Sequence, residues 1–168
     1  MILDDYFVSP GTRASNDSAW LWQEDVLQDA DLIDIRQRLF PKTVGLLLDL
    51  RQALQIRHGN TAALIVREVS KVHWDDQTHR NDRVAWKISG SQVTLINDYL
   101  SLVLHFIWPA SLTLEGRRAE LYVGNIGGLS EAPSDYVADA DAAIEANQPS
   151  WTGAFELVTY AEHGQRPI

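Results

Sequence analysis

The chain contains no cysteine, a single methionine and no long uninterrupted run of apolar residues. Without cysteine, no disulfide, thiolate–metal site or cysteine nucleophile can contribute to the protein. The longest apolar stretch, Tyr99–Trp108, is interrupted by Ser101 and His105 and is shorter than the roughly 20 residues that span a bilayer. The first residues also lack the basic segment of a signal peptide. The sequence therefore predicts a cytoplasmic protein without a membrane segment.

Basic residues are scarce, because 14 Lys and Arg stand against 23 Asp and Glu, and the formal net charge is -9. The excess lies at the two ends: residues 1–40 have a net charge of -5, residues 129–168 of -6, and residues 41–128 of +2. We therefore expect one domain, 1–168, with an acidic N-terminal segment (1–40), a β core (41–128) and an acidic C-terminal segment of helix and strand (129–168). Such charge selects a basic protein partner and disfavours nucleic acid and membranes.

Alternating apolar residues predict strands in the middle of the chain. In 44–54, Leu46, Leu48 and Leu50 follow the period of a strand with one buried face. The other expected strands are Ala62–Trp74 with a bulge near Glu68–Ser70, a hairpin of Arg83–Ser89 and Gln92–Asn97, Tyr99–Ile107, a hairpin of Ser111–Glu115 and Arg118–Asn125, and Ala154–Tyr160. For Tyr99–Ile107 a helix stays an alternative, because the second face of this segment is only half polar.

Helix is expected in two places. Asp17 or Ser18 would cap a helix over Ala19–Asp29, and Ser134 would cap one over Asp135–Asn147, whose alanines favour helix. Asp31–Leu39 fits the helical and the strand period about equally. The pattern as a whole predicts a mainly β (α+β) fold: an antiparallel sandwich or rolled sheet of about seven or eight strands, with one or two peripheral helices.

The sequence contains no motif that identifies a reaction. The densest set of metal-ligating residue types is His73, Asp75, Asp76 and His79, but the spacing of the two histidines matches no standard zinc pattern. We interpret this stretch as a polar loop, since Asp, Asn and His are common in turns. The acidic run after Ser134 lacks the glycine of a calcium loop, so a solvated helix face explains it better. No catalytic residue, metal or cofactor is predicted.

Six tryptophans are the more informative feature. Tryptophan is enriched at interface hot spots, and a ring surrounded by carboxylates suits a basic partner surface. Trp86 is expected in the core. A helix would place Trp20 and Trp22 on different faces and expose at least one of them, and Trp74 and Trp151 are expected at the surface. The predicted partner-binding residues are these four rings and their acidic neighbours: Trp20, Trp22, Glu24, Asp25, Trp74, Asp75, Asp76, Asp135, Asp139, Asp141 and Trp151.

Three stretches, Thr43–Val69, Glu120–Tyr136 and Gln148–Trp151, resemble small bacterial single-domain proteins of the toxin-immunity type. The resemblance implies an acidic cytoplasmic protein that binds and blocks a cognate toxin, and it assigns no role to any residue.

These observations favour a non-enzymatic acidic binding protein: an immunity protein or inhibitor that neutralises a basic toxin, such as a nuclease, by occluding its active site. One alternative is a carbohydrate-binding β-sandwich module that stacks sugar rings on tryptophan. The second is a small metal-dependent hydrolase that uses His73, Asp75, Asp76 and His79.

Overall fold

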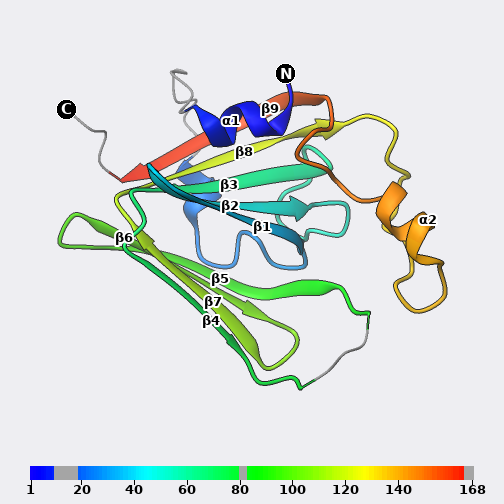
Figure 1. Cartoon of the computed structure of the whole chain (residues 1–168), viewed down its shortest axis with the longest axis horizontal. Coiled ribbons are helices and arrows are strands. Elements are labelled where there is room, and N and C mark those ends of the chain that lie inside the picture. Colours follow the sequence, from blue (N-terminus) through cyan, green and yellow to red (C-terminus); the bar gives the residue numbers. More distant parts are fainter. Residues whose placement is uncertain (10–18, 80–82, 165–168) are drawn as a thin grey trace.

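A computed structural model describes residues 1–9, 19–79 and 83–164 of the chain. Within these residues, nine antiparallel strands form one sheet in the order β4-β7-β6-β5-β1-β2-β3-β8-β9 (Figure 1). The strands are β1 (Asp31–Leu39), β2 (Lys42–Asp49), β3 (Thr61–Arg67), β4 (Lys71–Asp76), β5 (Trp86–Ile96), β6 (Tyr99–Phe106), β7 (Ala110–Gly116), β8 (Arg118–Ile126) and β9 (Phe155–Gly164). Two short helices, α1 (Leu3–Val8) and α2 (Asp141–Ala146), and a 3₁₀ turn, η1 (Ala19–Trp22), accompany the sheet in the described part.

The sheet consists of two halves that meet at a short seam. β5 pairs with β1 only through Lys87 opposite Asp31 and Trp86 opposite Leu32. Figure 1 shows β1, β2, β3, β8 and β9 as an upper layer and β4 to β7 as a lower layer. The main hydrophobic core takes buried side chains from β2, β3 and β8 above and from β5, β6 and β7 below. Both layers therefore bury one face against the same core.

The other face of the upper layer is also covered. Leu3, Tyr6 and Phe7 of α1 form a second buried cluster there with Trp151 and other side chains. Gly45 of β2 lies directly beneath, because a Cβ atom at this position would come within 2.8 Å of Phe7 and 2.9 Å of Trp151. Burial on both faces explains why every residue of β3 is buried.

A buried polar network fixes α1 to this face. Glu120 is fully buried and accepts hydrogen bonds from Arg67 (3.0 and 2.8 Å), from the hydroxyl of Tyr122 (3.0 Å) and from Arg118. Arg67 also donates to the carbonyl oxygens of Phe7 (3.1 Å) and Tyr6 (2.6 Å). The last turn of α1 is thereby tied to β3, and the buried charges compensate one another.

The mainly β class predicted from the sequence is confirmed, with nine strands instead of seven or eight. The strand expected from Leu46, Leu48 and Leu50 is β2, and all three residues lie in the main core. Asp31–Leu39, which the pattern left open, is a strand, as is Tyr99–Phe106. Because β1 and β9 belong to the sheet, the β structure extends beyond residues 41–128.

Both predicted hairpins of the middle region are wrong. Residues 83–97 do not turn at Gly90-Ser91, because β5 runs from Trp86 to Ile96 and only shifts register between Ile88 and Gly90. β7 and β8 follow each other in the chain but do not pair; β7 lies between β4 and β6, and β8 between β3 and β9. The expected bulge near Glu68–Ser70 is likewise a change of layer, at which Glu68 takes a positive φ of 50°.

Both predicted helices are shorter than expected. Only Ala19–Trp22 is helical within Ala19–Asp29, since Asp25 and Asp29 adopt positive φ values of 60° and 64°. The residues expected to cap this first helix, Asp17 or Ser18, lie outside the described residues. In the C-terminal segment the helix is limited to Asp141–Ala146.

Candidate functional site

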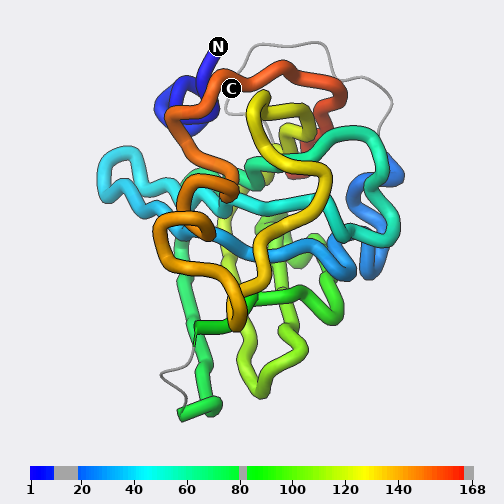
Figure 2. Tube along the Cα trace, turned by 90° about the vertical axis from the view of Figure 1, so that its right-hand side faces the viewer, coloured from blue at the N-terminus to red at the C-terminus, as the bar shows by residue number. Residues whose placement is uncertain are grey.

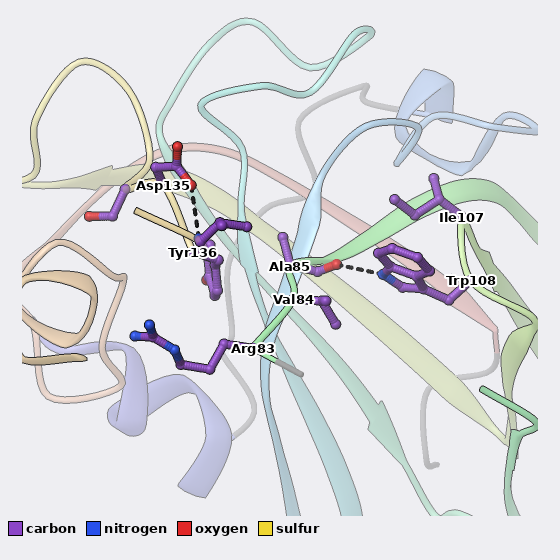
Figure 3. Close-up of a pocket in the computed structure, with 9 residues that line it drawn as sticks. Arg83, Val84, Ala85, Ile107, Trp108, Asp135 and Tyr136 are labelled. Carbon is purple, nitrogen blue, oxygen red and sulfur yellow. Dashed lines mark hydrogen bonds between the residues drawn. The ribbon is translucent and has the colours of Figure 1, made fainter. Parts of the chain in front are cut away.

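A cavity of about 670 Å³ opens where three segments meet at one end of the lower layer (Figure 3). Arg83, Val84 and Ala85 precede β5, Ile107 and Trp108 form the turn between β6 and β7, and Ser134 to Val137 belong to the loop before α2. The indole Nε1 of Trp108 donates to the carbonyl oxygen of Ala85 at 3.0 Å, which fixes the ring against its neighbouring segment. We call this cavity the Trp108 pocket.

The loop side of the Trp108 pocket is held in a tight turn by Asp135. Its Oδ1 accepts the backbone N–H groups of Val137 (2.8 Å) and Ala138 (3.1 Å), and its own N–H donates to Asp139 Oδ2 (2.8 Å). Donation from the Val137 N–H, followed by that from Ala138, lowers the pKa of the Asp135 carboxyl. The carboxylate is therefore negative at neutral pH. The helix predicted over Asp135–Asn147 does not include this turn, since α2 begins only at Asp141.

Tyr136 lines the pocket next to this turn. Its hydroxyl accepts a hydrogen bond of 2.6 Å from the side-chain amide of Gln148. Partial burial raises the pKa of the Tyr136 phenol. The ring therefore stays neutral and presents an aromatic wall with a fixed polar end.

Arg83 is the single cationic side chain that lines the pocket among the described residues. It forms an ion pair with Asp141 and donates to the carbonyl oxygen of Asp139 at 3.2 Å. Asp141 thus neutralises the positive charge of Arg83, and these contacts link residues 139–141 to the segment before β5.

The loop from Gly127 to Ala146 is anchored at its base by Arg51. Nη1 of Arg51 donates to the carbonyl oxygens of Ser130 and Ala132, both at 3.1 Å, and to Asn147 Oδ1 at 2.8 Å. The guanidinium also pairs with Asp49 at 2.6 Å, and the side chains of both residues are only 3% exposed. This buried pair places the loop over the Trp108 pocket.

A second, shallower depression of about 320 Å³ adjoins the pocket and shares Trp108 with it. Asp75 of β4, Gln77, His105 and Ser111 also line it. At the end of β4, the Thr78 backbone N–H donates to Asp76 at 2.9 Å and lowers the pKa of that carboxyl. The surface around Trp108 therefore combines two depressions with carboxylates from β4 and from the loop.

The predicted partner-binding residues do not all lie in one place. Asp135 lines the Trp108 pocket, and Asp75 lines the adjoining depression. Asp139 and Asp141 do not line the pocket but are bonded to two residues that do, Asp135 and Arg83. In Figure 2 the loop 126–147, yellow to orange, runs down the centre, whereas the blue segment with η1 lies at the right-hand side. The group around η1 thus lies apart from the Trp108 pocket, whereas α1 at the start of the chain lies beside residues 151–155, where the Asp4 N–H donates to the Trp151 carbonyl oxygen at 3.0 Å.

The N-terminal group is partly absorbed into the fold. Trp20 and Trp22 are half-buried and pack against the main core, and Trp22 stacks on His163 with ring centroids 5.8 Å apart. Asp25 is exposed, but its Oδ1 accepts the N–H of Ser91 at 3.1 Å. Glu24 is exposed.

Trp151 is a correction to the sequence analysis, because the expected surface ring is only 2% exposed. Its Nε1 donates to Asp34 at 2.8 Å, and the guanidinium of Arg36 lies 5.0 Å from its ring centroid. Trp74, by contrast, is 37% exposed, although it also packs against Trp86 and Phe106 at centroid distances of 5.1 and 5.4 Å.

His73, Asp75 and Asp76 lie in β4, so the strand extends two residues into the expected polar loop, and His79 lies beyond the end of the strand. Among the described residues, no three or more His, Asp or Glu side chains are grouped so as to hold a metal ion.

Sequence reasoning did not identify Trp108, Tyr136, Arg83 or Arg51 as site residues. A tryptophan at a strand end followed by Pro109 is a usable signal for Trp108, since such a ring lies at the sheet margin. The contacts of Arg51 join residues far apart in the sequence and have no local signature.

No protein-family model, no curated protein and no solved structure matches this chain. In the part of the chain that the structure describes, no helix is both long and apolar enough to cross a membrane.

Proposed function

We propose that the protein is a non-enzymatic acidic binding protein that neutralises a basic protein partner through the surface around the Trp108 pocket. The proposed partner is a toxin, such as a nuclease, and the proposed effect is occlusion of its active site. One observation carries the proposal: Asp135 lines an aromatic and apolar pocket, and the only described cation lining it, Arg83, is already paired with Asp141.

The charge supports fast and selective association. Carboxylates on one surface attract a basic partner and raise the association rate, and this effect weakens as salt screens the charges. A phosphate-binding cleft is rich in Lys and Arg, so an acidic protein that enters it competes with the nucleic acid for the same charges.

The pocket supports short-range affinity. An Arg or Lys side chain of the partner would lie against the rings of Trp108 and Tyr136, with its charge near Asp135. Stacking of a cation on an aromatic ring contributes about 0.5–2 kcal/mol, and more of this is retained where water is excluded. The bent nine-stranded sheet, which we interpret as an antiparallel sandwich, supplies a rigid support, and the cytoplasm is the compartment in which such an inhibitor would act.

The test uses affinity capture from the native cell, followed by association kinetics with the captured protein. The pocket variant is Asp135→Asn/Asp139→Asn, which keeps the acceptor oxygens of the turn. The control Asp98→Asn/Glu156→Gln removes the same charge from exposed positions away from the pocket. We expect the association rate of wild type to fall as salt rises, and the pocket variant, unlike the control, to associate more slowly at low salt. A captured acidic partner, or equal rates for both variants, would contradict the proposal.

A further inference from the structure

β4 forms one end of the sheet, and its outer edge is open in the described part of the chain. The strand pairs with β7 on one side, from Lys71 opposite Glu115 to Asp76 opposite Ala110. No described residue pairs with its other side (Figure 1). At the opposite end of the sheet, Ile2 forms an antiparallel bridge with Ala154, and the Phe155 N–H of β9 donates to the Met1 carbonyl oxygen at 2.8 Å. An open strand edge is a template for another strand, so β4 is an available position for strand addition.

The side chains of β4 divide between the two faces of the lower layer. Val72 and Trp74 lie opposite Leu114 and Leu112, two fully buried core residues, so they belong to the inner face. Each nevertheless remains 37% exposed, because no further described strand lies beside β4 on its outer side. Lys71, His73 and Asp75 alternate with them and lie on the outer face. The edge therefore combines an exposed apolar row with a row of charged and polar groups.

The order of these residues is complementary to itself. If two copies of β4 pair antiparallel around a two-fold axis at His73, Lys71 lies opposite Asp75 of the second copy, and Asp75 opposite its Lys71. In the same register Val72 lies opposite Trp74 of the second copy, again twice. Directly opposed residues of antiparallel strands share a face, so both charge pairs form on the outer face and both apolar pairs on the inner face.

We infer that two copies of this chain associate through β4, in the His73-centred antiparallel register. The contact is isologous, as closed two-fold dimers require, and it joins the two lower layers into one continuous sheet. Charges of one sign on β4 would keep copies apart, whereas Lys71 and Asp75 have opposite signs at symmetric positions. The net charge of -9 opposes association at long range, so we expect a dimer that dissociates on dilution. This inference does not depend on the proposed function.

The first test measures the mass of the wild-type chain by sedimentation equilibrium from about 5 to about 500 µM. We expect a rise from the monomer mass of 18.9 kDa toward twice that value. Amide hydrogen exchange of residues 71–76 should slow over the same range, while exchange of residues 155–164 stays constant. A mass of 18.9 kDa throughout, or unchanged exchange in β4, overturns the inference.

The second test examines the register with two charge reversals. In a dimer of the Lys71→Asp variant, each introduced aspartate lies opposite Asp75 of the second copy. In a dimer of the Asp75→Lys variant, each introduced lysine lies opposite Lys71 of the second copy. Each variant dimer should therefore dissociate at least about tenfold more readily than the wild-type dimer. An equimolar mixture should dimerise again, because each reversed chain then meets the opposite charge. Dimers of unchanged strength in the single variants, or no recovery in the mixture, would show the pairing to be wrong. If a variant does not fold, the wild-type mass and exchange measurements decide.

Discussion

Arg51 and Asp49 form a buried ion pair with 2.6 Å between Nη2 and Oδ2, and the same guanidinium holds the loop that lines one side of the Trp108 pocket. Arg51 therefore connects the end of β2 to residues 130–147, which are remote in the sequence. Replacing it affects both the stability of the upper layer and the shape of the site.

We expect Arg51→Ala to lower the free energy of unfolding by roughly 3–5 kcal/mol, because the buried carboxylate of Asp49 loses its partner. Hydrogen exchange in residues 129–147 should accelerate as well. Urea unfolding and exchange mass spectrometry measure the two effects. Arg57→Ala is the control: this arginine is exposed and makes one long hydrogen bond of 3.4 Å to Leu54, so its loss should change little.

The network around Glu120 leads to a second prediction. Glu120→Gln keeps the shape of the side chain but leaves Arg67 and Arg118 without their shared negative charge in a buried position. We expect a loss of roughly 3–5 kcal/mol in urea unfolding and release of α1, seen as faster exchange of residues 3–8. Glu115→Gln removes a charge from an exposed pair with Lys71 and should cost at most about 1 kcal/mol. Equal losses in the two variants would show that burial does not govern the Glu120 network.

The sequence predicts those strands whose burial is one-sided and regular. β6 alternates between buried and more exposed residues and forms a strand. β2 also forms, because Leu46, Leu48 and Leu50 keep the period of a strand, although both of its faces are buried. The pairing of strands is not encoded in such local patterns. Gly116-Arg117 has the composition of a hairpin turn, yet the chain changes layer there, since Arg117 N–H bonds to the Arg67 carbonyl oxygen at 3.1 Å. Glycine provides the same conformational freedom in a turn, a crossing or a register shift.

The sequence analysis names only one of the residues that line the Trp108 pocket, Asp135. Asp139 and Asp141 are joined to the pocket through their bonds to Asp135 and Arg83, and a role in partner binding stays a prediction for all three. Trp108 was not singled out, because its role depends on the loop that Arg51 holds across a long sequence separation. Trp151 was misplaced for the same reason: its polar neighbours in sequence favour exposure, but α1 covers it.

Substitutions of Trp151 therefore test the packing of the core and not the binding of a partner. Trp151→Ala should lower the free energy of unfolding by about 3–5 kcal/mol, because a large cavity forms above Gly45. Trp151→Phe should cost less, since it keeps a ring against Phe7 but loses the hydrogen bond to Asp34. Thermal and urea unfolding give the comparison. Val137→Ala, at a position 85% exposed, is the control that should leave stability unchanged.

His163 makes the stability of the fold depend on pH. Its ring stacks on Trp22, and burial lowers the pKa of the imidazole below its ordinary value of 6.5. The folded protein thus holds the neutral ring, and the unfolded chain binds more protons between the lowered pKa and 6.5. Stability supplied by His163 is fully present above this window and is lost as pH falls through it. We expect the urea midpoint of the wild-type protein to decrease when the pH is lowered from 7.5 to 5.5. The decrease should be smaller in His163→Gln. His58→Gln, at an exposed loop position, should behave as the wild type. An NMR titration assigns the change: an imidazole of His163 that titrates at or above 6.5 would contradict this account.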